Sequence, residues 1–199
     1  YNFIMHPRIE IYQFKNIIKN KTNLYEKADI IIFATKWRTK NESKNGYDDF
    51  TDLDKIIQKI KGDNKKLIIF GPNPEFKYTL NKYRFTKIYL TNYKKKLIEE
   101  GTTNLSNTEL LSLEKVYYSQ YENNKDIIET NEKLKNISKK NNIKFVDLIS
   151  IVCDKDKKVC KFRSNKNKDE IFRDYGRFSL TGLSYFGNRF FNGKVLKFD

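Results

Sequence analysis

Three short apolar runs, separated by longer segments of mixed polarity, constrain the fold of this chain most strongly. The runs are ADIIIFAT, KKLIIFG and IKFVDLI, at residues 28–35, 65–71 and 143–149. Each is rich in β-branched or aromatic residues, which is typical of strands that are buried on both faces. We therefore predict three central strands at these positions.

Segments with helical spacing of apolar residues lie before, between and after the runs. Acidic or hydroxyl-bearing residues mark several of their starts. The predicted helices cover residues 7–20, 48–62, 106–121, 124–140 and 179–191. Strands that alternate with helices indicate a mainly parallel sheet that is covered on both faces. The expected fold is a flavodoxin-like three-layer α/β/α sandwich, as a single domain over residues 1–199.

The carboxyl ends of the strands are where such a sheet binds its ligands. The segments TKWRTKN, GPNPEF and DLISIVC lie at the ends of the three predicted strands. A fourth segment, DYGRFS, comes just before the last predicted helix. We expect the chemistry of the protein in these four segments.

The net charge of the chain is +15, from 40 Lys and Arg against 25 Asp and Glu. One interpretation is a polyanionic partner, such as anionic lipid headgroups or an acidic polysaccharide. The other is that the lysines only solvate the surface of a chain rich in Lys, Asn and Ile. No nucleic-acid-binding motif occurs, so nucleic acid is not an expected partner. No apolar run reaches the roughly 18 residues that a membrane-spanning helix needs.

The two cysteines, Cys153 and Cys160, belong to the segment CDKDKKVC. A metal site would need more ligands nearby, and the only histidine, His6, is distant in the sequence. A disulfide that closes a small loop and a pair of free thiols are the alternatives. We expect the disulfide, which would indicate an oxidising compartment.

Four segments, taken in order, resemble the SGNH-type domain of membrane acyltransferases of the acyltransferase 3 family. They are ADIIIFATKW, LIIFGPNPEF, FVDLISIVC with its short Cys-to-Cys segment, and DYGRFSLTG. The last segment matches the family motif Asp-x-x-His-Leu/Phe-Ser/Thr-x-x-Gly except at Arg177. The resemblance covers the chain from about Ala28 to its C-terminus, and the order of the motifs makes it specific.

The resemblance implies a serine esterase or acyl carrier on the outer, periplasmic side of the cytoplasmic membrane. Such domains transfer or hydrolyse acetyl and related acyl groups on lipopolysaccharide, peptidoglycan or other cell-surface glycans. The expected partners are an acylated glycan and a membrane acyltransferase domain upstream of this chain. No cofactor and no metal are expected.

The family nucleophile is a serine in a Gly-Asp-Ser motif that follows the first strand. This motif does not occur in the 199 residues, which begin at Tyr1. We therefore expect the first strand and the nucleophile to lie upstream, as in an N-terminally truncated domain. The sheet should then lack a strand beside residues 28–35 and expose apolar surface there.

The family also assigns catalytic roles to the DYGRFS segment. Asp174 takes the position of the acid that orients the base, and Arg177 takes the position of the base, a histidine. A guanidinium stays protonated, so Arg177 cannot accept the serine proton. It could instead donate hydrogen bonds to an oxyanion, anchor an anionic glycan, or pair with Asp174 and close the site. We expect Arg177 to face the same cleft as Asp174 and Trp37.

Trp37 and Arg38, after the first predicted strand, are the candidate substrate-binding residues. Trp37 is either a residue that faces the sugar or acyl group or a packing residue at the rim, and Arg38 is a ligand for an anion or an oxyanion. Ser179 is predicted to cap the last helix. Helical spacing favours core packing for Tyr117, Tyr118 and Tyr121 over stacking on sugar rings.

Two functions follow. The leading hypothesis is an extracytoplasmic O-acyltransferase or esterase domain that acts on cell-surface glycans and is impaired where Arg177 replaces the histidine. The alternative is a non-catalytic basic module that binds an anionic glycan or a membrane surface on the same fold.

Overall fold

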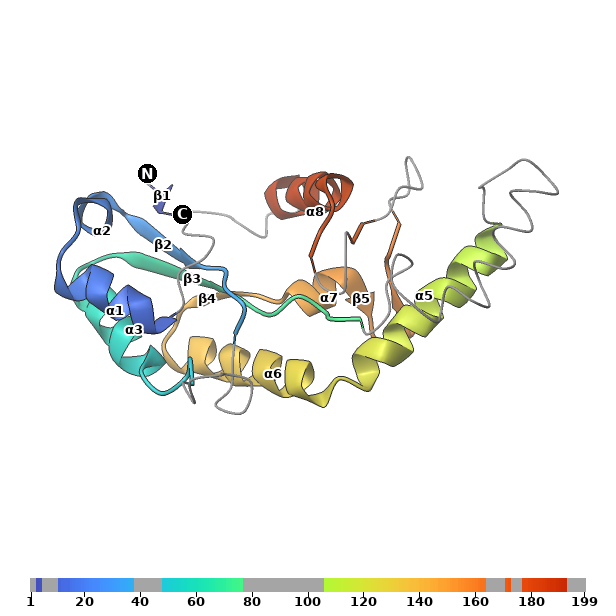
Figure 1. The fold of residues 1–199 in the computed structure, drawn as a ribbon, viewed down its shortest axis with the longest axis horizontal. Helices are drawn as coiled ribbons and strands as arrows, with labels where there is room; N and C mark the ends of the chain where they lie inside the picture. The colour runs from blue at the N-terminus through green and yellow to red at the C-terminus, as the bar shows by residue number, and fades with distance from the viewer. Residues whose placement is uncertain are drawn as a thin grey trace. The chain divides into compact units, whose positions relative to one another are not determined.

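A computed structural model describes residues 3–4, 11–37, 48–76, 106–163, 171–172 and 177–192. The chain forms two compact units. Unit 1 comprises Tyr1–Pro72 and Asp126–Leu148, and unit 2 comprises Asn73–Lys125 and Ile149–Asp199. The elements of both units are labelled in Figure 1.

Unit 1 contains a parallel sheet in the order β1-β2-β3-β4. Its strands are β1 (Phe3–Ile4), β2 (Ile30–Phe33), β3 (Lys66–Phe70) and β4 (Lys144–Val146). All neighbouring pairs are parallel, with Ile31 opposite Leu67 and Ile69 opposite Phe145. The three predicted strands and their parallel arrangement are therefore confirmed.

The edge of the sheet beside β2 differs from the expectation. We predicted that no strand would lie beside residues 28–35, but β1 pairs there, with Phe3 opposite Ile30 and Ile4 opposite Ile31. The expectation of an empty edge is therefore wrong. A strand of two residues leaves no alternation of apolar residues that sequence analysis can recognise.

The third predicted strand is also shorter than expected. It ends at Val146, and Leu148–Val152 forms the short helix α7. Leu148 and Ile149 are buried in either case, at 8% and 0% exposure. Burial alone cannot distinguish a strand from a buried helical turn, which is why the apolar run predicted the wrong element here.

Helices cover the sheet of unit 1. They are α1 (Ile11–Lys19), α2 (Asn23–Lys27), α3 (Leu53–Gly62) and α6 (Lys125–Lys140). Helices α1, α3 and α6 share one core with the strand face that carries Ile31 and Ile69. The opposite strand face is buried as well, since Ile30 is 0% and Ile68 is 3% exposed. Burial on both faces is what a three-layer arrangement predicts.

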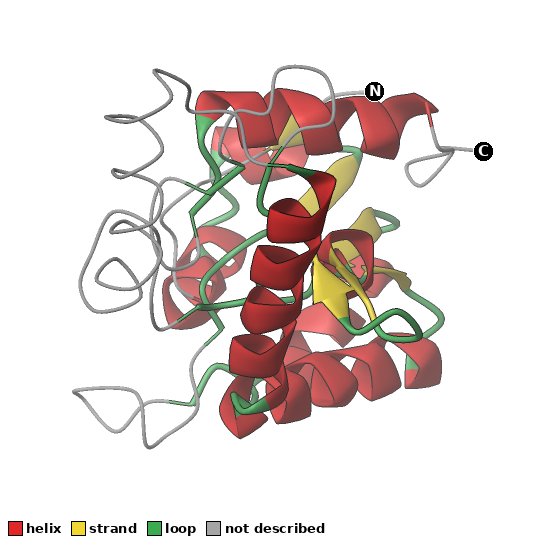
Figure 2. Ribbon diagram, turned by 90° about the vertical axis from the view of Figure 1, so that its right-hand side faces the viewer, coloured by secondary structure: helices red, strands yellow, loops and turns green. Residues whose placement is uncertain are grey.

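The described part of unit 2 has helices, loops and very short strands, the three kinds of structure that Figure 2 distinguishes by colour. Its elements are α5 (Asn107–Glu122), most of α7, β5 (Cys153–Asp154), β6 (Val159–Cys160) and α8 (Leu180–Asn192). Strands β5 and β6 form an antiparallel hairpin, and β6 packs against α5. Helix α5 is capped by Ser106, which forms a reciprocal capping box with Glu109.

The core of unit 2 is aromatic. The ring of Tyr117 stacks on Phe162 with centroids 5.1 Å apart and an interplanar angle of 3°. Phe76 contacts both Tyr117 and Phe172 edge to face. Tyr117, Tyr118 and Tyr121 are all buried. The three tyrosines therefore pack in the core, as their helical spacing predicted.

Candidate functional site

The end of β3 is held from both sides of the strand. On one side the indole Nε1 of Trp37 donates a hydrogen bond to the carbonyl of Phe70, at 2.8 Å. On the other side the backbone N–H of Gly71 donates to the carbonyl of Val146, at 2.9 Å. These bonds fix the backbone at the point where β3 leaves the sheet, which is the edge where ligands bind in such folds.

Trp37 itself lies in the core of unit 1. It is 3% exposed, and its ring stacks on Phe50 with centroids 6.0 Å apart. The ammonium of Lys133 lies 3.9 Å from the centre of the Phe50 ring. These contacts agree with the alternative in which Trp37 is a packing residue. Its part in substrate binding stays a prediction.

A buried amide lies against the same point of β3. Asn131, on α6, is 3% exposed, and its side-chain oxygen has no hydrogen-bond partner among the described residues. A Cβ added to Gly71 would stand 2.5 Å from this oxygen, so only glycine fits there. Sequence analysis missed Asn131, because a single polar residue within a helix normally indicates a solvent-exposed position.

A buried carboxylate in the turn before α3 was also missed. Asp49 is only 2% exposed, next to Asp48, whose carboxylate accepts a hydrogen bond from the N–H of Phe50 at 2.8 Å. The only signal in the sequence was the acidic pair itself, which we interpreted as a helix start. Buried carboxylates are rare, and nothing else in the sequence indicated this one.

The segment that carries Asp174 and Arg177 starts and ends in a small hairpin of unit 2. Phe172 and Phe178 form an antiparallel bridge, and their rings are 5.2 Å apart. The N–H of Ile171 donates to the carbonyl of Phe162 at 2.7 Å. The two flanks of the segment are therefore tied to each other and to Phe162, just after β6.

Ser179 links this hairpin to α8. Its hydroxyl oxygen accepts a hydrogen bond from the N–H of Gly182 at 3.0 Å, which confirms the predicted N-cap. Its own N–H donates to the carbonyl of Ile171 at 2.8 Å. A Cβ on Gly182 would stand 2.1 Å from that carbonyl oxygen, so the hairpin and the helix meet where only glycine fits.

Arg177 is exposed on this hairpin. Asp174 and Arg38 lie outside the described residues. Whether Arg177 shares a cleft with Asp174 and Trp37 therefore stays a prediction. An exposed guanidinium can donate several hydrogen bonds to an anion or an oxyanion, and it cannot act as a base.

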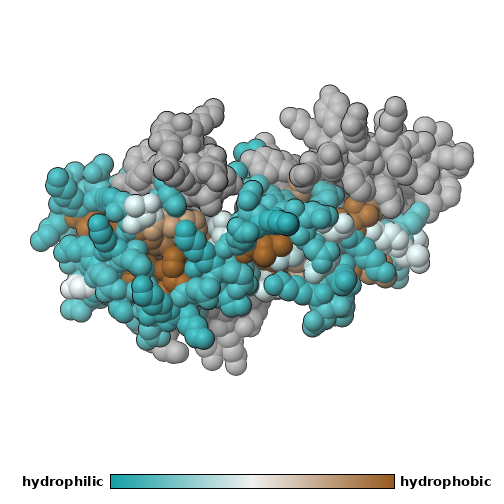
Figure 3. Space-filling model, turned by 90° about the horizontal axis from the view of Figure 1, so that it is seen from below, coloured by the Kyte–Doolittle hydropathy of each residue, from teal (hydrophilic) through white to brown (hydrophobic). Residues whose placement is uncertain are grey.

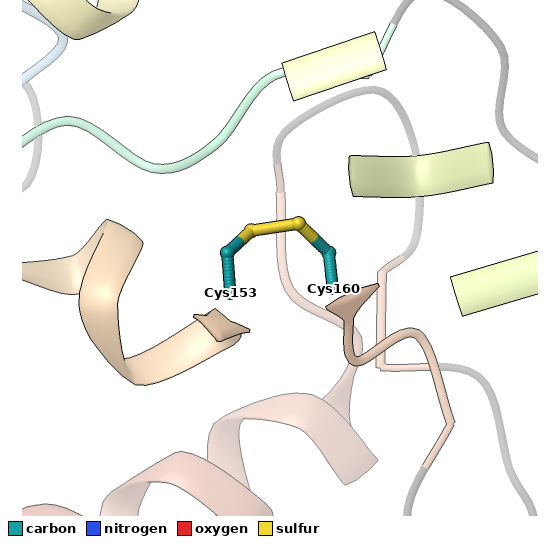
Figure 4. The surroundings of a disulfide bond; sticks show 2 residues. All are labelled: Cys153 and Cys160. Carbon is teal, nitrogen blue, oxygen red and sulfur yellow. A yellow bond between two sulfur atoms is a disulfide. The ribbon is translucent and has the colours of Figure 1, made fainter. Parts of the chain in front are cut away.

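The disulfide between Cys153 and Cys160 is confirmed (Figure 4). The two residues are opposite each other in the β5–β6 hairpin. Both are buried, at 2% and 0% exposure. The bond therefore crosslinks the hairpin at its base, two residues before Phe162, whose carbonyl accepts the hydrogen bond from Ile171.

A buried carboxylate lies beside this hairpin. Glu114, on α5, is 8% exposed, and the ammonium of Lys161 is 3.9 Å from its Oε1. Burial raises the pKa of the Glu114 carboxyl above its ordinary value, and Lys161 opposes this shift. Glu114 is thus a titratable group inside unit 2 that sequence analysis did not identify.

The surface of the molecule is mostly polar on the side shown in Figure 3, where hydrophobic residues form small separate groups. This is compatible with lysines that solvate the surface. Within the described part of the chain, no group of three or more His, Cys, Asp and Glu side chains is placed to hold a metal ion. Nor does any described helix have the length and apolar character to cross a membrane.

Comparison with known proteins gives one match. A family model described as "SGNH domain (fused to AT3 domains)" matches residues 8–191. No curated protein and no solved structure matches the chain. The family match covers strands β2, β3 and β4 of unit 1 together with the disulfide hairpin, the Arg177 hairpin and α8 up to residue 191 in unit 2.

Proposed function

The chain belongs to the family of SGNH domains that are fused to AT3 domains, and from this premise we propose that it is the acyl-handling domain of a membrane O-acyltransferase. In this proposal it lies on the extracytoplasmic side of the membrane. There it transfers or hydrolyses acetyl groups on a cell-surface glycan. The match of nearly the whole chain to this family is the observation that carries the proposal.

The proposed chemistry needs a serine nucleophile, a base and an acid that orients the base. We assign the orienting position to Asp174 and leave the serine to be identified by the labelling experiment below. Arg177 stands where the base is expected and cannot accept a proton. Its proposed role is to donate hydrogen bonds to the developing oxyanion or to a negatively charged group of the glycan.

A second candidate rests on one specific observation, the arginine at the position of the base. If the hairpin only binds an anion, the domain is a basic module that holds an anionic glycan close to the membrane enzyme. The net charge of +15 suits such a partner.

The experiment that separates the two uses membranes from the strain that makes the complete protein, with and without its gene. The acyltransferase proposal expects fewer alkali-labile acetyl esters on the cell-surface glycan when the gene is deleted. It also expects a fluorophosphonate probe to label a serine of the complete protein. A loss of acetyl esters without labelling of a serine, together with binding of the de-acetylated glycan by the complete protein, would favour the binding module.

A further inference from the structure

The point where β3 leaves the sheet collects three different contacts. The indole of Trp37 donates a hydrogen bond to the carbonyl of Phe70, and the N–H of Gly71 donates one to the carbonyl of Val146. The side-chain amide of Asn131 packs directly against Gly71. The first two are complete hydrogen bonds. In the third contact, the side-chain oxygen of Asn131 lies against the backbone of Gly71 without accepting a hydrogen bond from it.

The unpaired oxygen of Asn131 is costly. A buried acceptor without a donor destabilises a fold, whereas an apolar side chain of the same shape in its place is neutral or stabilising. Leucine has that shape, and α6 already presents Leu134, which is 0% exposed, to the same core. Packing alone therefore does not explain an asparagine at position 131.

A second buried asparagine shows how this fold uses an amide for structure. Asn141, just after α6, is 6% exposed. Its Nδ2 donates to Asp54 and to the carbonyl of Ile137, and its Oδ1 accepts from Gln58 at 2.8 Å. Both ends of that amide are satisfied, in contrast to the oxygen of Asn131.

Helix α6 runs from the carboxyl ends of the strands towards their amino ends. Asn131 is in the second turn of the helix, against Gly71 at the carboxyl end of β3. Ser138 lies seven residues later, about 10 Å further along the axis, near the start of β4. Its hydroxyl is also buried without a partner among the described residues. Of these two residues, Asn131 is the one at the carboxyl ends of the strands, where a parallel sheet binds ligands.

We propose that the side-chain oxygen of Asn131 accepts a hydrogen bond from a hydroxyl donor when the glycan binds beside the end of β3 in unit 1. The donor is either a hydroxyl of the acceptor sugar or a water molecule that the sugar holds in place. This inference rests on the proposed function.

The test compares the complete wild-type protein with Asn131→Leu and Ser138→Ala in membrane vesicles. The acyl donor is p-nitrophenyl acetate, and the acceptor is the strain's own cell-surface glycan after mild alkaline de-esterification. The temperature at which the domain becomes sensitive to protease reports its stability. We expect Asn131→Leu to lower kcat/KM about fivefold to tenfold, the loss of one hydrogen bond, without lowering that temperature. Ser138→Ala should leave the rate unchanged.

The kinetic constants identify the donor. A higher KM for the glycan indicates a sugar hydroxyl, and a lower kcat at constant KM indicates a bridging water. Unchanged kinetics in Asn131→Leu would overturn the role of Asn131 and leave the proposed function intact. A joint loss of rate and heat stability would also overturn it, because it would indicate packing. A wild-type protein without any turnover would overturn the proposed function, and this inference with it.

Discussion

The end of β3 and the Phe172–Phe178 hairpin both fix a backbone next to candidate site residues, but with different means. At the end of β3, one fixing group is the buried side chain of Trp37, and the other is the backbone carbonyl of Val146. In the hairpin they are backbone hydrogen bonds and aromatic contacts, and Arg177 is exposed. The first region is thus suited to hold a shape, and the second to present a charge.

The difference indicates where mutations should separate stability from activity. Changes at the end of β3 alter a packed site in which each atom has close neighbours. Changes at Arg177 alter a group that is exposed to solvent. Five predictions sharpen or contradict this contrast, beginning with the largest expected effect.

Arg177→His in the complete protein should raise the hydrolysis of p-nitrophenyl acetate by about 10²–10⁴-fold, because an imidazole can accept the serine proton. Heat stability should not change. Arg177→Lys is the control, since it keeps the charge and supplies no base at neutral pH. A fully active wild type that Arg177→His slows would show that the arginine has a positive role, at the oxyanion or the glycan.

Replacing both cysteines, Cys153→Ala with Cys160→Ala, should lower the free energy of unfolding by about 2.5 kcal/mol, from the loop-closure entropy of a short ring. Urea unfolding of the domain measures this. Wild-type protein unfolded in reductant should match the double variant. Wild-type protein that keeps its full free energy of unfolding in reductant would contradict this prediction.

Gly71→Ala should lower the free energy of unfolding by about 1–3 kcal/mol, because the new methyl group meets the oxygen of Asn131. Gly62→Ala is the matched control. It has open space and a helical position, so it should be neutral or slightly stabilising. Adding Asn131→Ala to Gly71→Ala should restore part of the loss. Additive losses would contradict the contact at the end of β3.

Ser179→Ala should lower the free energy of unfolding by about 1 kcal/mol through the loss of the cap of α8. Thermal unfolding followed by circular dichroism measures the change. Ser106→Ala removes the cap of α5 and should have an effect of similar size. A much larger effect at Ser179 would indicate that the hairpin depends on the side chain as well as on its backbone bonds.

Glu114→Gln should change how stability depends on pH, with the smallest effect of the five because Lys161 partly compensates the burial. A raised pKa in the folded state means that the folded protein binds this proton more tightly than the unfolded chain. Stability should therefore fall as the pH rises through the pKa of Glu114 in the unfolded and then the folded state. Glu114→Gln should remove that fall and be more stable than wild type at neutral pH. Parallel urea curves for the two proteins, from about pH 4 to about pH 7, would contradict this.

The central strands and most helices could be predicted because their periodicity is local. The β-branched runs around Ile31 and Ile69 indicate buried strands whatever they pair with. The run at residues 143–149 failed in its second half, where a buried helical turn and a buried strand have the same composition. The paired strand Phe3–Ile4 was missed because two residues carry no period.

Features of the candidate site could be predicted only where the residues that form them are close together in the sequence. The cap at Ser179 and the disulfide follow from neighbouring residues, so the sequence indicated both. The burial of Asn131 and Asp49 depends on elements that are distant in the sequence. The sequence does not show whether a polar residue faces water or the core. Only the tertiary structure distinguishes an exposed polar residue from a buried one.

The anchoring of the Arg177 hairpin also makes it a natural graft point. Ile171 and Phe172 on one side, and Phe178 and Ser179 on the other, take their positions from Phe162, from each other and from α8. The five residues between Phe172 and Phe178 can therefore be exchanged as a cassette against the loops of other members of the family. Such chimeras would transplant the acid and the base together, and they would show whether catalytic competence moves with a pentapeptide or belongs to the scaffold that receives it.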